Sequence, residues 1–227
     1  MRKAAEFHRI HAEGRSHQMR RRVALEAARL ISEHGMRDYR QAKLKAAERL
    51  GLHDEQQLPR NREIEDALRE HQRLFQSDSQ PRALRARREA AAEAMRFLKP
   101  YDPRLVGPVL EGTADAHSAV CLHLFCDAPE EVAIFLHEHG IRPEQRARTL
   151  RVDRQRNTNY PVLLFAAADI PIDITIFPRG ALRQPPLDRI DERPMRRASL
   201  ASLEAMLAEE EIAQFESGEA QDGKPEA

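Results

Sequence analysis

Apolar residues recur every three or four positions through the first hundred residues, which is the spacing of amphipathic helices. The pattern turns helical near His17 and pauses at the His-Gly pair 34–35. Capping residues and prolines bound three further helices, predicted over 38–50, from about 61 to 75, and over 81–99. The N-terminal region is therefore expected to be helical.

The pattern changes after Pro100. Short apolar runs rich in β-forming residues appear at 104–110, 119–125, 149–152, 161–167 and 172–177, and one helix is inserted at 128–140. Strands with an inserted helix, rather than a regular strand–helix alternation, are typical of an α+β fold. We therefore expect a helical N-terminal region followed by a mixed β-sheet domain with flanking helices.

The ends of the chain and the segment before the last helix look different from both parts. Residues 1–16 and 216–227 lack apolar periodicity, and both are expected to be disordered, the second as an acidic tail. Residues 178–198 are rich in Pro and Arg and are expected to form a surface loop, and Ser199 can cap a last helix. The predicted parts are thus a disordered arm at 1–16, a helical region at 17–80, the α+β domain at 81–215 and the tail.

Charge is distributed unevenly, although the 37 basic and 37 acidic side chains cancel. Residues 1–99 hold 23 Lys/Arg and 15 Asp/Glu, a net charge of +8, so the remaining residues carry a net charge of −8. This asymmetry indicates an anionic partner for the first half or contact between the halves. The alternative is that the Arg-rich helices are simply well solvated.

Several classes of protein are disfavoured. No apolar run approaches the roughly 18 residues that span a bilayer, and the N-terminus lacks the apolar part of a secretory signal. Cys121 and Cys126 should point to opposite faces of one strand, so they cannot form a disulfide there. No glycine-rich loop of the P-loop or dinucleotide-binding type is present. We expect a cytoplasmic protein without a membrane partner, and the sequence indicates no oligomeric state.

Residues 111–125, EGTADAHSAVCLHLF, carry the candidate chemistry. A predicted strand runs into Gly112-Thr113, a short polar turn follows, and a second strand begins. A small turn of this kind lets backbone N–H groups approach a phosphate, and carboxylates on adjacent strands can hold the divalent ions that phosphoryl transfer needs.

This layout resembles the polymerase-β-like nucleotidyltransferase superfamily over roughly residues 82–178. In that resemblance Gly112-Thr113 corresponds to the Gly-Ser turn, and residues 118–122 correspond to the Ser-Asp-hydrophobic-Asp-Leu strand. Asp173, in PIDITIF, corresponds to the third carboxylate. The resemblance implies a nucleotide site at Gly112, Thr113 and Ser118. The rest of the chain is similar to bacterial proteins described only as uncharacterised or nucleotidyltransferase-like.

The chain departs from this family at the paired carboxylates, where it has Ala119 and Cys121. A thiol is a poor ligand for magnesium, which prefers oxygen, and Asp173 alone cannot hold two ions. We therefore expect a nucleotidyltransferase fold that has lost catalysis, needs no cofactor, and acts as a nucleotide-binding or regulatory and interaction protein.

Two arrangements would restore metal chemistry. Asp115 and Asp127 can supply displaced carboxylates beside Asp173, which would give an active, Mg²⁺-dependent nucleotidyltransferase. Cys121, His123 and Asp173 can instead be ligands for zinc, although a packed cysteine and a hydrogen-bonded histidine are the commoner outcome and no metal is predicted.

Residues 20–52 also resemble the opening of a TetR-type helix-turn-helix repressor, with Arg20, Arg21 and Arg22 placed to contact phosphates. The match fails at the third helix. A long loop, HDEQQLPRN, precedes the third helix, and the exposed face of that helix is partly acidic. A DNA-binding regulator is therefore a second alternative, and weak, sequence-independent nucleic-acid binding is the most that we expect from the basic half.

Overall fold

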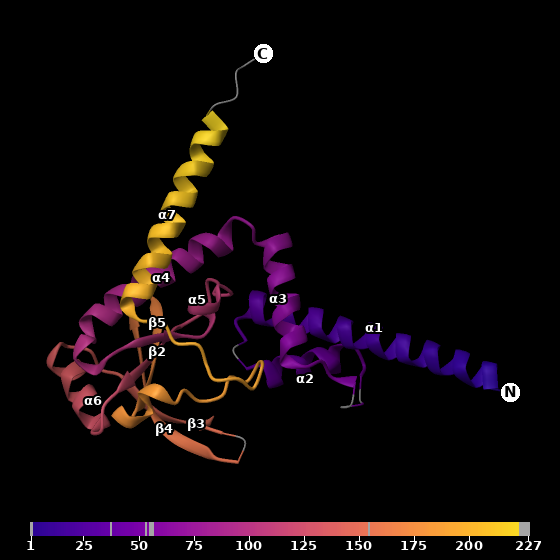
Figure 1. Ribbon diagram of the computed structural model, residues 1–227, viewed down its shortest axis with the longest axis horizontal. Coiled ribbons are helices and arrows are strands. Elements are labelled where there is room, and N and C mark those ends of the chain that lie inside the picture. Colours follow the sequence, from indigo (N-terminus) through magenta and orange to yellow (C-terminus); the bar gives the residue numbers. More distant parts are fainter. Residues whose placement is uncertain (1, 37, 53, 55–56, 154, 223–227) are drawn as a thin grey trace. The chain divides into compact units, whose positions relative to one another are not determined.

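The computed structural model describes residues 2–36, 38–52, 54, 57–153 and 155–222. The chain divides into two compact units, one made of residues 1–80 and 188–192, the other of residues 81–187 and 193–227. Helices form the first unit, and a five-stranded mixed sheet with flanking helices forms the second (Figure 1). The predicted α+β fold with N-terminal helices is confirmed.

Three helices build the first unit: α1 (Arg2–His34), α2 (Tyr39–Arg49) and α3 (Asn61–Phe75). Asp38 caps α2 as predicted, since its carboxylate accepts hydrogen bonds from the amides of Arg40 and Gln41. Alanines and a few larger apolar residues of the three helices form one core, in which Val23, Leu30, Ile64 and Leu68 are buried. The segment 188–192 joins this unit through Arg62, whose guanidinium pairs with Asp191.

The second unit begins within α4 (Ser79–Phe97) and continues through two short elements, β1 (Arg104–Val106) and α5 (Pro108–Glu111). Strand β2 (Val120–Phe125) leads into α6 (Pro129–Glu138). The strands β3 (Glu144–Arg151), β4 (Asn157–Ala167) and β5 (Ile170–Phe177) then follow without a further helix between them. The last element is α7 (Leu200–Asp222), which Ser199 caps by accepting a hydrogen bond from the amide of Ser202.

The strands lie in the order β1-β2-β5-β4-β3. Strands β2 and β5 are parallel neighbours, and the other pairs are antiparallel. The crossover from β2 to β5 passes through α6 and the β3–β4 hairpin, so the sheet is mixed. At the β1 edge, Leu105 exchanges two backbone hydrogen bonds with Ala198, which covers that edge.

The two faces of the sheet differ. One face packs against α4, α6 and α7 in the main core, where Leu122, Leu124, Ile174 and Ile176 are buried. The other face carries the alternate residues of the same strands. A small aromatic cluster of Phe125, Tyr160 and Phe177 covers part of it, together with residues of the loop after β5. This second face holds the candidate site.

The structure corrects four local predictions. Residues 2–16, expected to be disordered, belong to α1, and residues 216–222 of the expected tail belong to α7. The predicted strand 104–110 is a strand only to Val106, because Gly107-Pro108 turns the chain into α5. Strand β3 begins at Glu144, in a charged stretch that lacks the apolar alternation of a half-buried strand. Residues 223–227 of the expected tail lie outside the described residues.

Within the described part of the chain, no helix combines the length and the apolar character needed to cross a membrane.

Candidate functional site

Parallel pairing of β2 with β5 sets the geometry of the site. The register places Cys121 beside Asp173 and His123 beside Thr175. Cys121 and His123 are two residues apart on β2, and Asp173 and Thr175 are two residues apart on β5. Because register partners point to the same side of a sheet, these four side chains share one face. Cys121 and Asp173, two of the candidate site residues, therefore lie on neighbouring strands.

Asp173 is held by an arginine from the edge of the sheet. Arg148 of β3 reaches across β4, and its two terminal nitrogens donate to the two carboxylate oxygens of Asp173 at 3.0 and 2.7 Å. One of these nitrogens also donates to the hydroxyl of Thr175 at 3.0 Å. The Asp173 side chain is 11% exposed and that of Arg148 is 39% exposed. The pair is bidentate, which is the strongest geometry for a guanidinium and a carboxylate.

The electrostatics favour a charged arginine at this position. Burial alone would lower the pKa of Arg148, but the hydrogen bonds and negative charge of Asp173, with a smaller contribution from Cys121, raise the pKa above its ordinary value. The guanidinium therefore remains a fixed positive charge beside Asp173. A divalent cation at the same carboxylate would have to displace it.

A second arginine lies farther along the same face. The Nε of Arg197 donates to Nδ1 of His123 at 3.0 Å, and its Nη1 donates to the carbonyls of Ala181 and Leu182. The guanidinium carbon lies 4.9 Å from the ring centre of Phe125 and 5.1 Å from that of Phe177, a cation–π arrangement.

The environment of His123 keeps its imidazole neutral. Burial lowers the pKa of His123 to about 3, and the positive charges of Arg197 and Arg148 contribute to the decrease. Because Nδ1 accepts from Arg197, the single ring proton of the neutral form must be on Nε2. His123 therefore serves here as a buried acceptor, and it has a packing role beside Phe177, 4.5 Å away between ring centres.

The Gly112-Thr113 turn closes a helix. Gly112 has a positive φ of 82° and ends α5, and the amides of Thr113 and Ala114 both donate to the carbonyl of Pro108. These two amides are therefore engaged within the turn rather than directed toward a phosphate. The Ser118 hydroxyl is likewise engaged, since it donates to Asp115 at 3.0 Å.

Gly107 lies beside Cys121 of β2. A β-carbon placed on Gly107 would lie 3.6 Å from the Cβ of Cys121, and Gly107 has a positive φ of 71°. Sequence reasoning missed this residue, although the Gly-Pro step at 107–108 is a signal for a turn into a helix. Ala119, the other position where the family has an acid, is buried just before β2.

The two candidate replacement acids have local roles. The Asp115 carboxylate accepts hydrogen bonds from the amide of His117 and from Ser118, so it stabilises the turn before β2. Asp127 accepts from the amide of Arg179, beyond the ends of β2 and β5. Asp127 is six positions after Cys121, the register partner of Asp173, and this spacing corresponds to roughly 20 Å of extended chain. Asp127 therefore does not share a site with Asp173.

The side chains at the site do not form a metal-binding donor set. Among the residues that the structure describes, no group of three or more His, Cys, Asp or Glu side chains is arranged to hold a metal ion. At the β2–β5 pair the available donors are a thiol, a neutral imidazole that accepts from Arg197, and a carboxylate already paired with Arg148. These donors do not fit magnesium, which requires several oxygen ligands.

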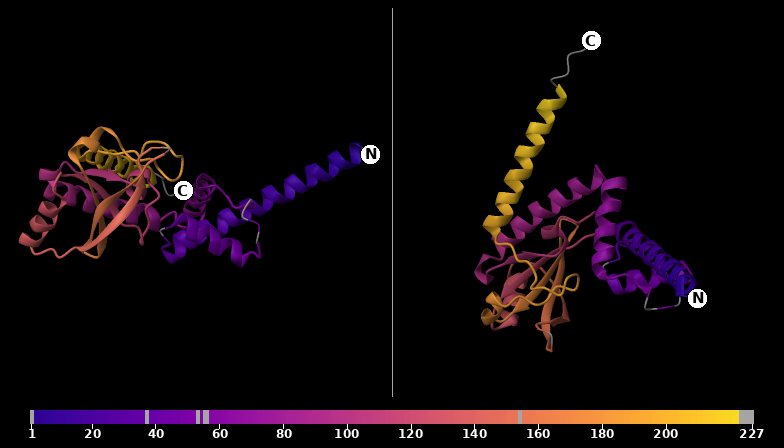
Figure 2. Two further views of the ribbon diagram at one scale, coloured as in Figure 1. Left: turned by 90° about the horizontal axis from the view of Figure 1, so that it is seen from below. Right: turned by 45° about the vertical axis from the view of Figure 1, so that its right-hand side comes forward.

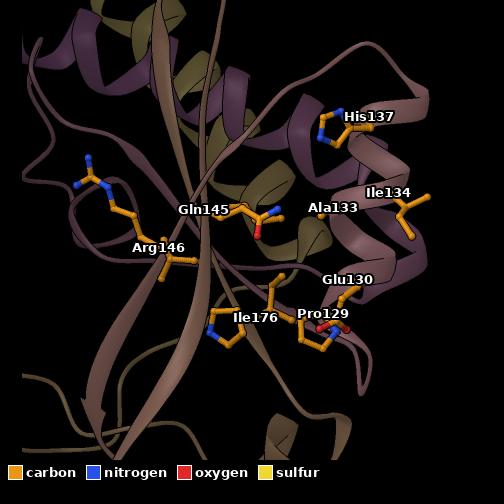
Figure 3. Close-up of a pocket in the computed structure, with 11 residues that line it drawn as sticks. Pro129, Glu130, Ala133, Ile134, His137, Gln145, Arg146 and Ile176 are labelled. Carbon is orange, nitrogen blue, oxygen red and sulfur yellow. The ribbon is translucent and has the colours of Figure 1, made fainter.

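A separate groove lies on the helix side of the sheet, between α6 and the β3–β4 hairpin (Figure 3). Its volume is about 450 Å³, and its lining is mainly apolar, with Ala133, Leu163 and Ile176 among the contributors. Gln145 points toward α6, whereas Arg146 points away from it. The groove is thus distinct from the Arg148–Asp173 site, which uses the opposite face of the sheet.

The predicted phosphate-contacting arginines lie in the first unit. Arg21 and Arg22 are exposed on α1, whereas Arg20 is half-buried. Two basic residues of α2 are engaged elsewhere: Lys43 donates to the carbonyl of Pro59, and Arg49 pairs with Glu26. Eleven residues, 50–60, separate α2 from α3, which is longer than the turn of a helix-turn-helix motif.

Comparisons with models of known protein families, with curated proteins and with solved structures find no match for this chain.

Proposed function

We propose that the sheet unit is a non-catalytic, nucleotidyltransferase-like domain that acts as a nucleotide-binding or regulatory and interaction protein. One observation carries the proposal: the bidentate pair between Arg148 and Asp173. Active members of the resembled superfamily hold divalent ions between carboxylates on adjacent strands. In this chain the neighbour of Asp173 is Cys121, and an arginine provides the positive charge.

The chemical consequence is a loss of Lewis acidity. A guanidinium can neutralise a carboxylate or a phosphate, but it cannot lower the pKa of a bound hydroxyl as a metal ion does. The paired guanidinium therefore neutralises Asp173 but provides no Lewis acid that would activate an attacking oxygen. The nucleotide part of the proposal rests on the sequence resemblance, and the second arginine of the face, Arg197, is compatible with it.

Two measurements test this function. The first follows transfer of label from each of the four NTPs, with Mg²⁺ or Mn²⁺, to protein, RNA or small acceptors. We expect no metal-dependent transfer. Incorporation that depends on the metal and disappears in Asp173→Ala would overturn the proposal and would favour the active alternative.

The second measurement is thermal unfolding with nucleotides, with EDTA in one arm and Mg²⁺ in the other. A ligand at 100 times its Kd adds about 2.7 kcal/mol to the free energy of unfolding by mass action. We expect any nucleotide that stabilises the protein to do so equally in both arms. Stabilisation only with Mg²⁺ would contradict the proposal, and no stabilisation by any nucleotide would leave the interaction role as the function.

A further inference from the structure

Helix α7 is fixed along α4 by one of its faces. Leu203 is buried in the main core, and Leu207 packs against the same core. Two ion pairs join the helices: Glu204 with Arg96 at 2.7 Å, and Glu210 with Arg88. Beyond this contact the helix continues away from the sheet of its own unit, as Figure 1 and the right-hand view of Figure 2 show.

A second apolar seam runs along the outer face of α7. The positions are separated by four, three, four and three residues, and all five side chains are exposed: Ala201, Ala205, Ala208, Ile212 and Phe215. Ile212 is 59% exposed and Phe215 is 71% exposed. This spacing is that of the contact seam of a coiled coil, where each apolar side chain packs into a facing helix.

Acidic residues flank the seam. Glu209, Glu211 and Glu216 are exposed beside it, and α7 as a whole contains seven acidic residues and no basic residue. Like charges at the flanking positions of two facing helices oppose their association. A second α7 is therefore a poor partner for this seam, whereas a basic helix is a good one.

The same chain contains a helix of that chemistry. Residues 2–22, within α1, contain seven Lys/Arg and two Glu, with Phe7 and Ile10 three positions apart. The α1 side chains that the structure describes before Val23, those of residues 16–22, are exposed or half-buried. Its length, about 31 Å at 1.5 Å per residue, exceeds the roughly 21 Å of the seam.

We propose that the outer face of α7 docks residues 2–22 of a second copy of this chain. Each copy offers one basic helix and one acidic helix, so the same contact can form twice between two copies. The Ile212–Phe215 end supplies the apolar contact, and the flanking glutamates select a basic partner. This inference is independent of the nucleotide role proposed above.

A charge-exchange experiment tests the contact with the full-length protein. One variant carries Glu209→Arg, Glu211→Arg and Glu216→Arg, and the other carries Arg15→Glu, Arg21→Glu and Arg22→Glu. The substituted glutamates and Arg21 and Arg22 are exposed, and circular dichroism verifies folding of both variants. Sedimentation velocity at low ionic strength should give a dimer for the wild type and a monomer for each variant alone. The association constant of each variant should be at least tenfold lower than that of the wild type.

Mixing the two variants decides between docking and a general effect of charge. Each reversed helix then meets its complement on the other chain, so the mixture should dimerise again. A wild type that is monomeric at low ionic strength, dimers that persist in both variants, or a mixture that stays monomeric would each overturn the proposal.

A matched pair of apolar substitutions tests the seam itself. Ile212→Ser with Phe215→Ser should weaken dimerisation at least tenfold, whereas Ile134→Ser should leave it unchanged. Ile134 is a suitable control because it is 57% exposed, close to the value for Ile212, and lies on α6. Equal weakening by the control and by the seam variant would contradict docking at α7.

Discussion

The guanidinium of Arg148 on β3 lies against the carboxylate of Asp173 on β5, with nitrogen–oxygen distances of 3.0 and 2.7 Å. Strand β4 lies between these two strands, so the long arginine side chain spans a strand to reach its partner. The contact gives Asp173 a full set of strong donors without a metal ion. The Asp173 carboxylate therefore links β5 to β3 and also belongs to the candidate site.

Asp173→Asn should destabilise the sheet unit by about 1–3 kcal/mol, because the nearly buried partner of Arg148 loses its charge while the arginine keeps its own. The cost should stay well below that of a fully buried pair, since Arg148 is 39% exposed. Urea unfolding of the purified protein measures the change. Arg146→Ala is the control, because the Arg146–Glu144 pair is exposed on both sides and should contribute little to stability.

The double variant Arg148→Leu with Asp173→Leu tests whether the two side chains stabilise each other. Removing both charges leaves no unpaired ion, so its cost should be smaller than the sum of the costs of the two single variants. Additive costs would mean that the two side chains do not stabilise each other.

His123 should make the stability of the protein depend on pH. Its pKa is lowered to about 3 in the folded state, by burial and by Arg197 and Arg148, whereas an unfolded histidine titrates near 6.5. Above about pH 6.5 both states are neutral, and this group has no effect on the balance. As the pH falls from about 6.5 toward 3, the unfolded state binds a proton that the folded state does not, so the free energy of unfolding decreases.

The matched variant for this effect is His123→Gln. A glutamine oxygen can still accept from the Nε of Arg197 but does not titrate. Between about pH 7 and pH 4.5 the wild type should lose on the order of 2 kcal/mol more than the variant, measured by urea unfolding at each pH. Parallel losses in the two proteins would show that His123 is not the group responsible.

Gly107 should tolerate substitution less well than Gly112. Gly107 has φ 71° and ψ −154°, a region that is essentially restricted to glycine, and Gly107→Ala should cost about 1–3 kcal/mol. Gly112 has φ 82° and ψ 11°, close to the left-handed helical region, with open space where a β-carbon would lie. Gly112→Ala should cost about 1–2 kcal/mol. Thermal unfolding of the two variants compares them, and a larger loss in Gly112→Ala would refute the ranking.

The sequence predicts the elements of this fold where a local signal is strong. Asp38 and Ser199 act as the caps that their residue types indicate, and the apolar strands β2 and β5 lie within a residue or two of their predicted bounds. Register follows less directly. The pairing of Cys121 with Asp173 depends on β5 returning beside β2, an arrangement that only the tertiary structure sets.

The missed part of the site has a physical explanation. Strand β3 is a sheet edge, and its charged sequence, EQRARTLR, is typical of edges that avoid pairing with other chains. Such a strand lacks the apolar alternation by which strands are recognised. Arg148 therefore lies just outside the predicted strand 149–152, and its partner, 25 residues away in sequence, cannot be inferred from spacing. Gly107 was missed for a related reason, because its neighbour Cys121 is brought close by β1–β2 pairing.

Arg148 should occupy the position that a metal ion would take beside Asp173. Cys121→Asp alone places a second carboxylate beside Asp173, because the two positions are register partners on parallel strands. We expect this variant to bind no divalent ion, since the guanidinium of Arg148 already lies at Asp173 and can pair with the new acid as well.

Adding Arg148→Ala removes that competitor and leaves two carboxylates close together, an arrangement that raises their pKa values through mutual repulsion unless a cation neutralises them. Cys121→Asp with Arg148→Ala should therefore bind Mn²⁺, observed as loss of the free-ion signal in electron paramagnetic resonance, and Mn²⁺ should raise its melting temperature. Asp173→Ala in the same background should abolish both effects, while Asp127→Ala, beyond the far ends of β2 and β5, should change neither. Binding by Cys121→Asp with Arg148 intact, or none after Arg148→Ala, would mean that the arginine does not occupy the position of a metal ion.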